Sequence, residues 1–307
     1  MSSLWPATRE QDQRLLKTLL SNRSALRDMP ENWMKQWETV WAPVATWVAE
    51  QKREIGGVPV IGIQGGQGSG KSTLSRALCS LYREALGWNV VSVSIDDLYL
   101  THAERQRLGQ ETHPLLVTRG VPGTHDYELG KQVFADLKAL EPGAILKLPA
   151  FDKASDDRLP EQDWHKVFGP IDLILFEGWC VGCQPVSAEE LATPFNELER
   201  LEDTDGRWRH RANDMLAGPY RDWFAMIDRL VTMRVPGMQA VLNWRSQQEV
   251  ENNRNRRGAT TRSMDANALA RFIQHYERLT CNALRDLKEH ADLVLDLNSL
   301  HLVKRIE

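Results

Sequence analysis

The apolar positions of the chain follow two different spacings in turn. Short apolar runs predict strands at 58–63, 89–95, 144–148, 171–176, 229–235 and 292–297, and the continuous run at 171–176 is typical of a buried strand. Apolar residues at helical spacing predict helices between these runs, over 73–86, 127–140, 238–254 and 265–287. Strands that alternate with helices favour a parallel sheet with helices on both faces. We therefore expect an α/β fold whose main domain spans 55–307.

The first 54 residues lack this alternation and have a helical pattern. Their apolar residues recur at helical spacing, first as Leu15, Leu16, Leu19 and Leu20, then as Trp33, Trp37, Trp41, Val44 and Val48. Pro43 is expected at a kink or at a junction between helices. The tryptophan stripe could dock on a membrane or a partner, or pack on the chain's own domain. We expect 1–54 to form a helical extension packed on the core, and the polar segments 154–169 and 181–220 to be excursions over the ligand-binding face.

Composition and charge exclude several classes of protein. Of the 307 residues, 42% are apolar and 26% are charged, with a net charge of −4, so no overall basic field favours nucleic acid or an anionic membrane. No apolar run approaches the roughly 20 residues that cross a bilayer, and the first residues lack the pattern of a secretory signal. We expect a cytoplasmic protein with no membrane partner.

Four cysteines are too few to form a disulfide framework for a chain of this length. Cys180 and Cys183 have the spacing of a redox pair or of half a zinc site. A closed zinc site needs two more ligands at a matching spacing, and the sequence offers no second pair of this kind. We expect all four residues, Cys79, Cys180, Cys183 and Cys281, to be reduced thiols.

A glycine-rich segment follows the first predicted strand and precedes a predicted helix. It reads Gly65-Gly66-Gln67-Gly68-Ser69-Gly70-Lys71-Ser72, with Thr73 next, and fits the G-x-x-x-x-G-K-[ST] pattern of phosphate-binding loops. Glycines permit the tight path on which successive backbone N–H groups point at phosphate oxygens, and the helix N-terminus adds positive potential. Lys71 would reach the β- and γ-phosphates and the Ser72 hydroxyl would bind Mg²⁺. The segment predicts a P-loop fold that binds ATP with Mg²⁺.

Carboxylates follow two other predicted strands. Glu177 comes directly after the apolar run 171–176, at the carboxyl end of a strand, where α/β proteins bind their ligands. It could hold Mg²⁺ directly or through water. Asp96 and Asp97 end the strand after the P-loop helix, and two adjacent carboxylates repel each other unless a ligand or metal lies nearby. A kinase needs a carboxylate that orients the acceptor hydroxyl and accepts its proton; the alternative role is to cap a helix.

At this point the sequence resembles a known family. Ser94-Ile-Asp-Asp-Leu-Tyr-Leu-Thr101 is similar to the strand-end motif of the phosphoribulokinase, uridine kinase and pantothenate kinase superfamily. Four further segments, in order, resemble those of the plant-type D-glycerate 3-kinases and their fungal relatives: Arg119-Gly-Val-Pro-Gly-Thr-His-Asp126, Leu148-Pro-Ala-Phe-Asp-Lys153, Phe176-Glu-Gly-Trp179 and Asn243-Trp-Arg-Ser-Gln-Gln-Glu249. The resemblance runs from residue 58 to about 280.

The resemblance implies a role for each of these segments. It makes Asp96 the base that orients the acceptor hydroxyl, with Asp97 second, and Ser72, Glu177 and Asp96 the metal ligands. It places the acceptor pocket at Arg119, His125, Asp126, Asp152 and Lys153. A guanidinium binds a carboxylate through two bonds, so Arg119 is the preferred partner for the carboxylate of a hydroxy acid. A lid over about 250–264 would bring Arg254, Arg256 or Arg257 to the transferring phosphate.

Several hypotheses stay open at this stage. The first is an ATP-dependent kinase that phosphorylates a hydroxyl of D-glycerate, giving 3-phosphoglycerate. A pantothenate or uridine kinase is the alternative within the same class. The third is a nucleotide-binding regulatory protein on a kinase scaffold, because fold alone does not fix function, and its motivation is the tryptophan-rich N-terminal region. The basic cluster that begins at Arg254 has two alternatives to a lid. The first is a solvated helix end, and the second, which the sequence favours least, is nucleic-acid binding.

Overall fold

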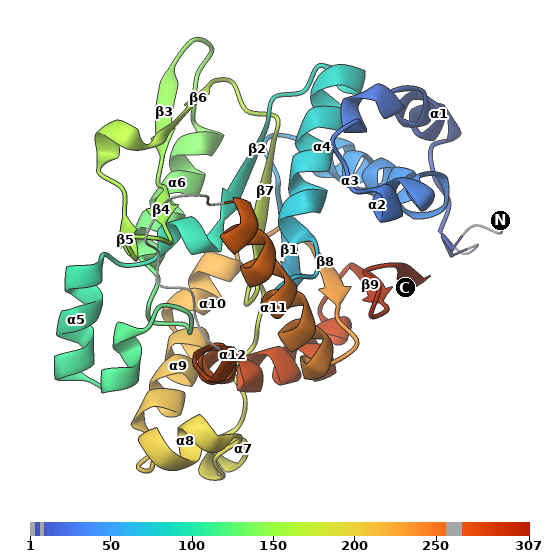
Figure 1. Ribbon diagram of the computed structural model, residues 1–307. Helices are drawn as coiled ribbons and strands as arrows, with labels where there is room; N and C mark the ends of the chain where they lie inside the picture. The colour runs from blue at the N-terminus through green and yellow to red at the C-terminus, as the bar shows by residue number, and fades with distance from the viewer. Residues whose placement is uncertain (1–3, 7–8, 256–265) are drawn as a thin grey trace.

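The computed structural model describes residues 4–6, 9–255 and 266–307, and for 248–255 and 266–267 it describes the backbone alone (Figure 1). Its centre is a six-stranded sheet with the strand order β10-β9-β8-β1-β7-β2. The strands are β1 Val60–Gly65, β2 Val90–Ser94, β7 Leu173–Gly178, β8 Arg229–Arg234, β9 Leu293–Leu297 and β10 Val303–Ile306. Five of them run parallel, and β10 pairs antiparallel with β9. The parallel sheet is as predicted, and β10 is an addition that the apolar pattern does not indicate.

Two small ribbons lie outside this sheet. In the first, β3 Ile145–Leu148 pairs antiparallel with β6 His165–Phe168, and in the second β4 Phe151–Asp152 pairs with β5 Asp157–Arg158. The strand predicted at 144–148 therefore exists but does not join the central sheet. Its Ile145 is 55% exposed, which a strand buried on both faces would not permit.

Helices lie on both faces of the sheet, with α4 Lys71–Leu86 in the core cluster on one face and α6 Tyr127–Lys138 in the cluster on the other. Three further helices are α5 His102–Glu111, α11 Met238–Asn255 and α12 Ala266–Asp286. The polar segment 181–220 holds more regular structure than its weak periodicity indicates: α7 Ala188–Ala192, α8 Glu197–Glu202, α9 Arg207–Ala217 and the start of α10 Pro219–Phe224. These helices are short, and they bury Trp208, Tyr220 and Trp223. Short 3₁₀ turns occupy Arg23–Leu26, Ile95–Leu98, Pro114–Val117, Glu161–Asp163 and Leu287–Glu289.

Alternate residues of each strand face opposite sides of the sheet, as a pleated strand requires. Along β7, Leu173 and Leu175 belong to the hydrophobic cluster that includes α3 and α4. Ile174 and Phe176 belong to the cluster on the other side, which includes Phe134 of α6 and Trp223 of α10. Both faces of β7 are thus buried, which explains its continuous apolar sequence.

The N-terminal residues pack on the same core as the sheet. They form α1 Gln13–Ser21, α2 Glu31–Lys35, a π-helical turn at Trp37–Trp41 and α3 Ala42–Ile55, which lie beside α4 (Figure 1). Trp33, Trp37 and Trp41 are buried, and the rings of Trp33 and Trp41 stack with centroids 3.8 Å apart. Pro43 lies in the first turn of α3, where its missing N–H is tolerated. The stripe is therefore a packing surface, and the domain boundary near 54 stays a prediction.

None of the helices in the described part of the chain is both long enough and apolar enough to cross a bilayer.

Candidate functional site

The P-loop, Glu177 and the Asp96–Asp97 pair lie at the carboxyl ends of three adjacent parallel strands. The central strand β7 pairs with β1 on one side and with β2 on the other. In the registers, Glu177 is the partner of Ile63 in β1 and of Ser94 in β2. Because parallel strands end at the same edge, the P-loop, Glu177 and the Asp96–Asp97 pair meet there.

The P-loop joins β1 to α4 with the backbone that its glycines permit. Gly68 and Gly70 have φ values of 79° and 97°, in the left-handed region. A Cβ on Gly68 would lie 2.6 Å from the Cβ of Trp244 in α11. The Trp244 ring stacks on His301 at 4.1 Å, and its indole N–H donates to the Ser299 carbonyl at 3.0 Å. The loop is therefore braced by residues from the far end of the chain.

The side chains of the loop converge on Glu177. The Ser72 hydroxyl donates to Glu177 Oε1 at 2.8 Å, and Lys71 Nζ donates to the Gly66 carbonyl at 3.3 Å. Burial lowers the pKa of Lys71, against the opposing charges of Glu177 and Asp96. Glu177 is buried while Ser72 is exposed. A carboxylate and a hydroxyl oxygen side by side form a ligand set that suits Mg²⁺.

Asp96 and Asp97 have different surroundings. Asp96 Oδ2 lies 2.7 Å from Lys153 Nζ, and Oδ1 accepts from the Tyr99 hydroxyl at 3.2 Å. Burial alone would raise the pKa of Asp96, but Lys153, with Lys71 and His125, lowers it to about 2. Asp97 Oδ1 accepts from the backbone N–H of Phe151 at 3.2 Å, and burial raises the pKa of Asp97 to about 6. Asp96 is therefore the ionised carboxylate that faces the cations.

The two charged residues of the 119–126 loop make ion pairs within the protein. Arg119 pairs with Asp156, and its guanidinium lies 5.4 Å from the centroid of the Phe151 ring. Asp126 caps α6, accepting from the N–H of Leu129, and also accepts from Arg158 at 3.0 Å. These bonds give Asp126 a structural role, whereas Arg119 remains 18% exposed.

The β4–β5 turn brings Lys153 to Asp96. Asp152 accepts from the backbone N–H groups of Ala154 and Ser155, both at 3.0 Å, and so holds the turn that presents Lys153. Of the five residues predicted for the acceptor pocket, Lys153 forms an ion pair with Asp96. Asp126 and Asp152 fix the backbone around it.

His125 is buried and reaches Asp96 through Tyr99. Its ring stacks on Tyr99 at 4.3 Å, and the Tyr99 hydroxyl bonds to Asp96. Nδ1 of His125 lies 2.7 Å from the Tyr220 hydroxyl. Burial lowers the pKa of His125 to about 3, against the charge of Asp96. The imidazole is therefore neutral near pH 7.

Several residues around the site were not predicted. Tyr220 comes from α10, and Tyr276 of α12 donates from its hydroxyl to the Arg119 carbonyl at 3.0 Å. Asp156 holds Arg119 and Arg105, with a φ of 57°. No local sequence signal marks these residues, because each reaches the site from a distant element. The positive φ of Asp156 gives it a turn conformation that Asp tolerates better than most residues do.

The lid prediction falls mainly outside the described residues. Arg254 lies in α11, whose backbone is described there, but its side chain is not. Arg256 and Arg257 both lie outside the described residues.

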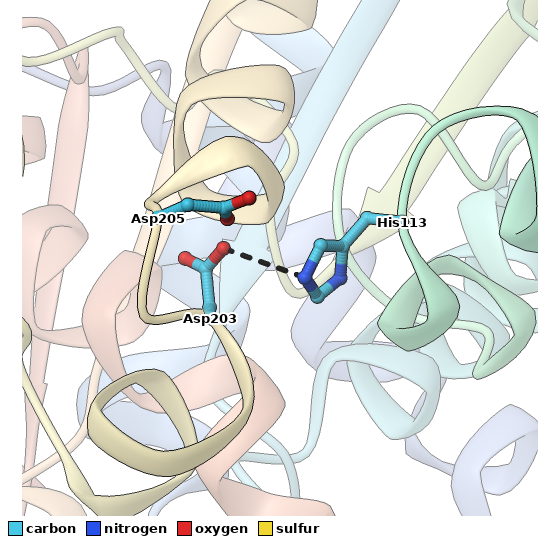
Figure 2. A group of neighbouring side chains, drawn as sticks. All are labelled: His113, Asp203 and Asp205. Atoms are coloured by element: carbon cyan, nitrogen blue, oxygen red, sulfur yellow. Dashed lines mark ion pairs between the residues drawn. The ribbon is translucent and has the colours of Figure 1, made fainter.

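A second cluster of possible metal ligands joins His113, Asp203 and Asp205 (Figure 2). His113 Nε2 lies 3.7 Å from Asp203 Oδ1, which also accepts from the N–H of Trp208 at 2.8 Å. The other oxygen of Asp203 accepts from Arg209 Nη1 at 2.9 Å, and Asp205 pairs with Arg207. These donors occupy both carboxylates, so the cluster fixes the start of α9 and has no unpaired carboxylate to offer a metal.

The four cysteines are free thiols, as predicted. Cys180 and Cys183 are buried just after the end of β7. Burial raises the pKa of both thiols, that of Cys183 to about 12. A protonated, buried thiol is a poor nucleophile.

Comparison with known proteins gives relatives that are kinases. The chain is 31% identical over 258 residues to "Uncharacterized kinase mug58" of Schizosaccharomyces pombe, covering 79% of this chain and 87% of the relative. It is 33% identical over 199 residues to the chloroplastic D-glycerate 3-kinase of Arabidopsis thaliana, covering 62% of this chain and 41% of that protein. The chain thus matches less than half of the plant enzyme's length. No protein-family model matches the sequence.

Solved structures agree with these sequence relatives. The D-glycerate 3-kinase of Cryptococcus neoformans superposes with a TM-score of 0.71 and 26% identity, covering 87% of this chain and 98% of that structure. On this fold and these relatives, the chain belongs to the D-glycerate 3-kinase family of P-loop kinases and is a kinase.

Proposed function

We propose that this enzyme transfers the γ-phosphate of ATP to a hydroxyl of a small hydroxy acid, with D-glycerate as the acceptor and 3-phosphoglycerate as the product. The observation that carries the proposal is the placement of three groups on neighbouring strand ends: the P-loop after β1, Glu177 in β7 and Asp96 after β2. This arrangement lets a triphosphate and an alcohol meet at one edge of the sheet. The D-glycerate 3-kinases among the relatives support the choice of acceptor.

The nucleotide would bind along the loop from Gly65 to Thr73. Its backbone N–H groups and the first turn of α4 donate to phosphate oxygens. Lys71 adds a cation whose charge is only partly screened, because the residue is half-buried and close enough to Glu177 to interact with its charge. Positioning and electrostatic stabilisation of this kind supply most of the catalysis in phosphoryl transfer.

Mg²⁺ would be held by Ser72 and Glu177, with Asp96 the third predicted ligand. The 2.8 Å contact between the Ser72 hydroxyl and Glu177 Oε1 brings two hard oxygen donors together at the P-loop, which suits this ion. Mg²⁺ held there would neutralise part of the negative charge of the phosphates. The residues around it orient the phosphates and keep Asp96 ionised.

The acceptor would lie between Asp96 and the two cations. Asp96 is ionised near pH 7, so it can accept a hydrogen bond from the acceptor hydroxyl and then its proton. Lys153 lies against Asp96 and Arg119 is partly exposed, so either can face the carboxylate of a hydroxy acid. A pocket with two cations favours an anionic acceptor over a neutral nucleoside.

The regulatory alternative loses its motivation, because the tryptophan residues that suggested a docking surface lie in the core. The assay that tests D-glycerate also tests whether the enzyme is a pantothenate-type or uridine-type kinase. The test is a coupled assay of ADP release from ATP and Mg²⁺ with D-glycerate, pantothenate, uridine and sugar phosphates as acceptors. We expect D-glycerate to give the highest kcat/KM and Lys71→Ala to abolish turnover. Turnover of another acceptor with none of D-glycerate would overturn the assignment.

A further inference from the structure

Tyr220 is the one residue of α10 that bonds to the 119–126 loop. Its side chain is fully buried, and its hydroxyl bonds to Gly123 and to His125. The backbone N–H of Gly123 donates to it at 3.0 Å, and Nδ1 of His125 lies 2.7 Å away. A tyrosine from one helix thus ties together two residues of the predicted acceptor loop.

The direction of the second bond follows from counting protons. The backbone N–H of Gly123 can only donate, so it occupies a lone pair of the phenol oxygen and offers no acceptor for the phenol proton. A buried O–H without an acceptor is unfavourable, and Nδ1 is the acceptor in reach. Tyr220 therefore donates to Nδ1 of His125.

The other ring nitrogen of His125 then carries the proton. The imidazole is neutral, because burial lowers its pKa to about 3, and a neutral imidazole has one N–H. With Nδ1 accepting from Tyr220, the proton belongs on Nε2. Nε2 is buried and makes no hydrogen bond with the described residues. His125 thus holds a buried N–H donor without a partner.

The segment that carries His125 pairs with the segment that carries the predicted base. Tyr99 and His125 form an antiparallel bridge, supported by bonds from Leu100 N to Thr124 O at 2.9 Å and from Asp126 N to Leu98 O at 2.7 Å. Their rings stack, and Tyr99 bonds to Asp96. The chain segments that carry Asp96 and His125 are thus held side by side by backbone bonds.

We infer that Tyr220 is a positioning residue, whose hydroxyl fixes His125 as the neutral Nε2–H tautomer and so presents an N–H donor to an oxygen of the phosphate acceptor. The inference rests on the proposed function, since it assumes that the acceptor binds beside Asp96. It names a hydrogen-bond requirement in the acceptor, an oxygen that accepts from a neutral donor. It also gives a reason for the burial of His125, because burial keeps the imidazole neutral.

The tautomer is tested without any acceptor by long-range ¹H–¹⁵N NMR of the whole protein labelled at histidine. We expect the wild-type His125 to show a pyrrole-type Nε2 and a pyridine-type Nδ1, and Tyr220→Phe to lose that single form. A wild-type His125 with the proton on Nδ1 would overturn the inference, whatever the enzyme phosphorylates. Tyr127→Phe is the matched control, because the Tyr127 ring lies 6.2 Å from the Tyr220 ring and, among the described residues, it is Tyr220 whose hydroxyl bonds to the His125 ring.

The role in catalysis is tested by acceptor kinetics. Tyr220→Phe is expected to lower kcat/KM for D-glycerate about 10-fold, the size of one hydrogen bond, with the KM for ATP unchanged. His125→Gln, whose amide can place an N–H near the Nε2 position, should retain more activity than His125→Asn. In the His125→Gln background, Tyr220→Phe should lower kcat/KM less than it does in the wild type. Equal losses in both backgrounds, in proteins that melt normally, would leave Tyr220 with a purely structural role and overturn the inference. Absence of turnover with every acceptor, alongside the expected tautomer, would reject the proposed function and the acceptor contact while leaving the tautomer assignment intact.

Discussion

Lys153 Nζ lies 2.7 Å from Asp96 Oδ2, although the two residues come from different segments and Lys153 is 58% exposed. The pair keeps Asp96 ionised, because burial alone would raise the pKa of that carboxyl and the nearby cations bring it to about 2. Lys153 also raises no steric barrier to an acceptor, since a flexible exposed side chain can move.

Replacing Lys153 should therefore change the acid side of the pH profile. In Lys153→Met the pKa of Asp96 is expected to rise. Protonation of Asp96 should then abolish activity at a higher pH than in the wild type. The measurement is kcat/KM for the acceptor between pH 4 and pH 8. An unshifted acid limb in Lys153→Met would mean that this lysine does not control the ionisation of Asp96.

The two adjacent aspartates should respond differently to loss of charge. Asp96→Asn is expected to lower kcat by about 10²-fold or more, the usual contribution of a general base, with little change in ATP affinity. Asp97→Asn should keep kcat within a few-fold, since an amide oxygen can still accept from the N–H of Phe151.

Asp97→Asn should also stabilise the fold above pH 6. The pKa of Asp97 is raised to about 6, so the folded state holds this proton more tightly than the unfolded state, and stability is lost as pH rises through that value. Thermal melting at pH 5 and pH 8 measures the effect. A loss of kcat in Asp97→Asn as large as that in Asp96→Asn would contradict the assignment of roles.

Removing the charge of Glu177 should weaken the response to Mg²⁺. Glu177→Gln keeps the size of the side chain but replaces a carboxylate oxygen by an amide, a weaker ligand for a hard cation. The Mg²⁺ concentration for half-maximal activity is expected to rise about 10-fold, equivalent to roughly 1.4 kcal/mol. Glu104→Gln, at the cap of α5, is the control. Equal Mg²⁺ dependence in the two variants would remove Glu177 from the metal site.

Two left-handed glycines offer a matched test of the P-loop. Gly68 and Gly87 have φ values of 79° and 68°, so alanine at either one is expected to cost about 1–2 kcal/mol of stability. A Cβ meets Trp244 only at Gly68, because Gly87 has nothing within 4 Å of that position. Gly68→Ala should therefore also lose ATP affinity, measured by calorimetry, whereas Gly87→Ala should bind ATP normally. Equal ATP affinity in both variants would show that Trp244 does not shape the loop.

Buried histidines should reduce stability in acid. Burial lowers the pKa of His275 to about 4, so between that value and the usual pKa near 6.5 the unfolded chain holds a proton that the folded protein does not. The free energy of unfolding then falls by at most about 1.4 kcal/mol per pH unit as pH drops through this range. His275→Gln should show a smaller loss of melting temperature between pH 7 and pH 5. Replacing the exposed His165 by Gln is the control, and an identical loss in both variants would refute the effect.

The amino-acid sequence by itself determined the alternation of strands and helices, the P-loop and the acidic residues at the strand ends. Those features are local, because a glycine spacing or an apolar run of six residues carries its own conformational preference. It also indicated the order of the motifs that resemble the kinase family.

Only the tertiary structure decided how distant side chains share the site. The strand order placed Glu177 between the P-loop and Asp96, and folding brought Lys153 to Asp96, Asp156 to Arg119 and Tyr220 to His125. It also turned the tryptophan stripe inward and gave β3 a partner outside the central sheet. These contacts join residues with no spacing rule between them, and their energies depend on burial, which no local pattern fixes.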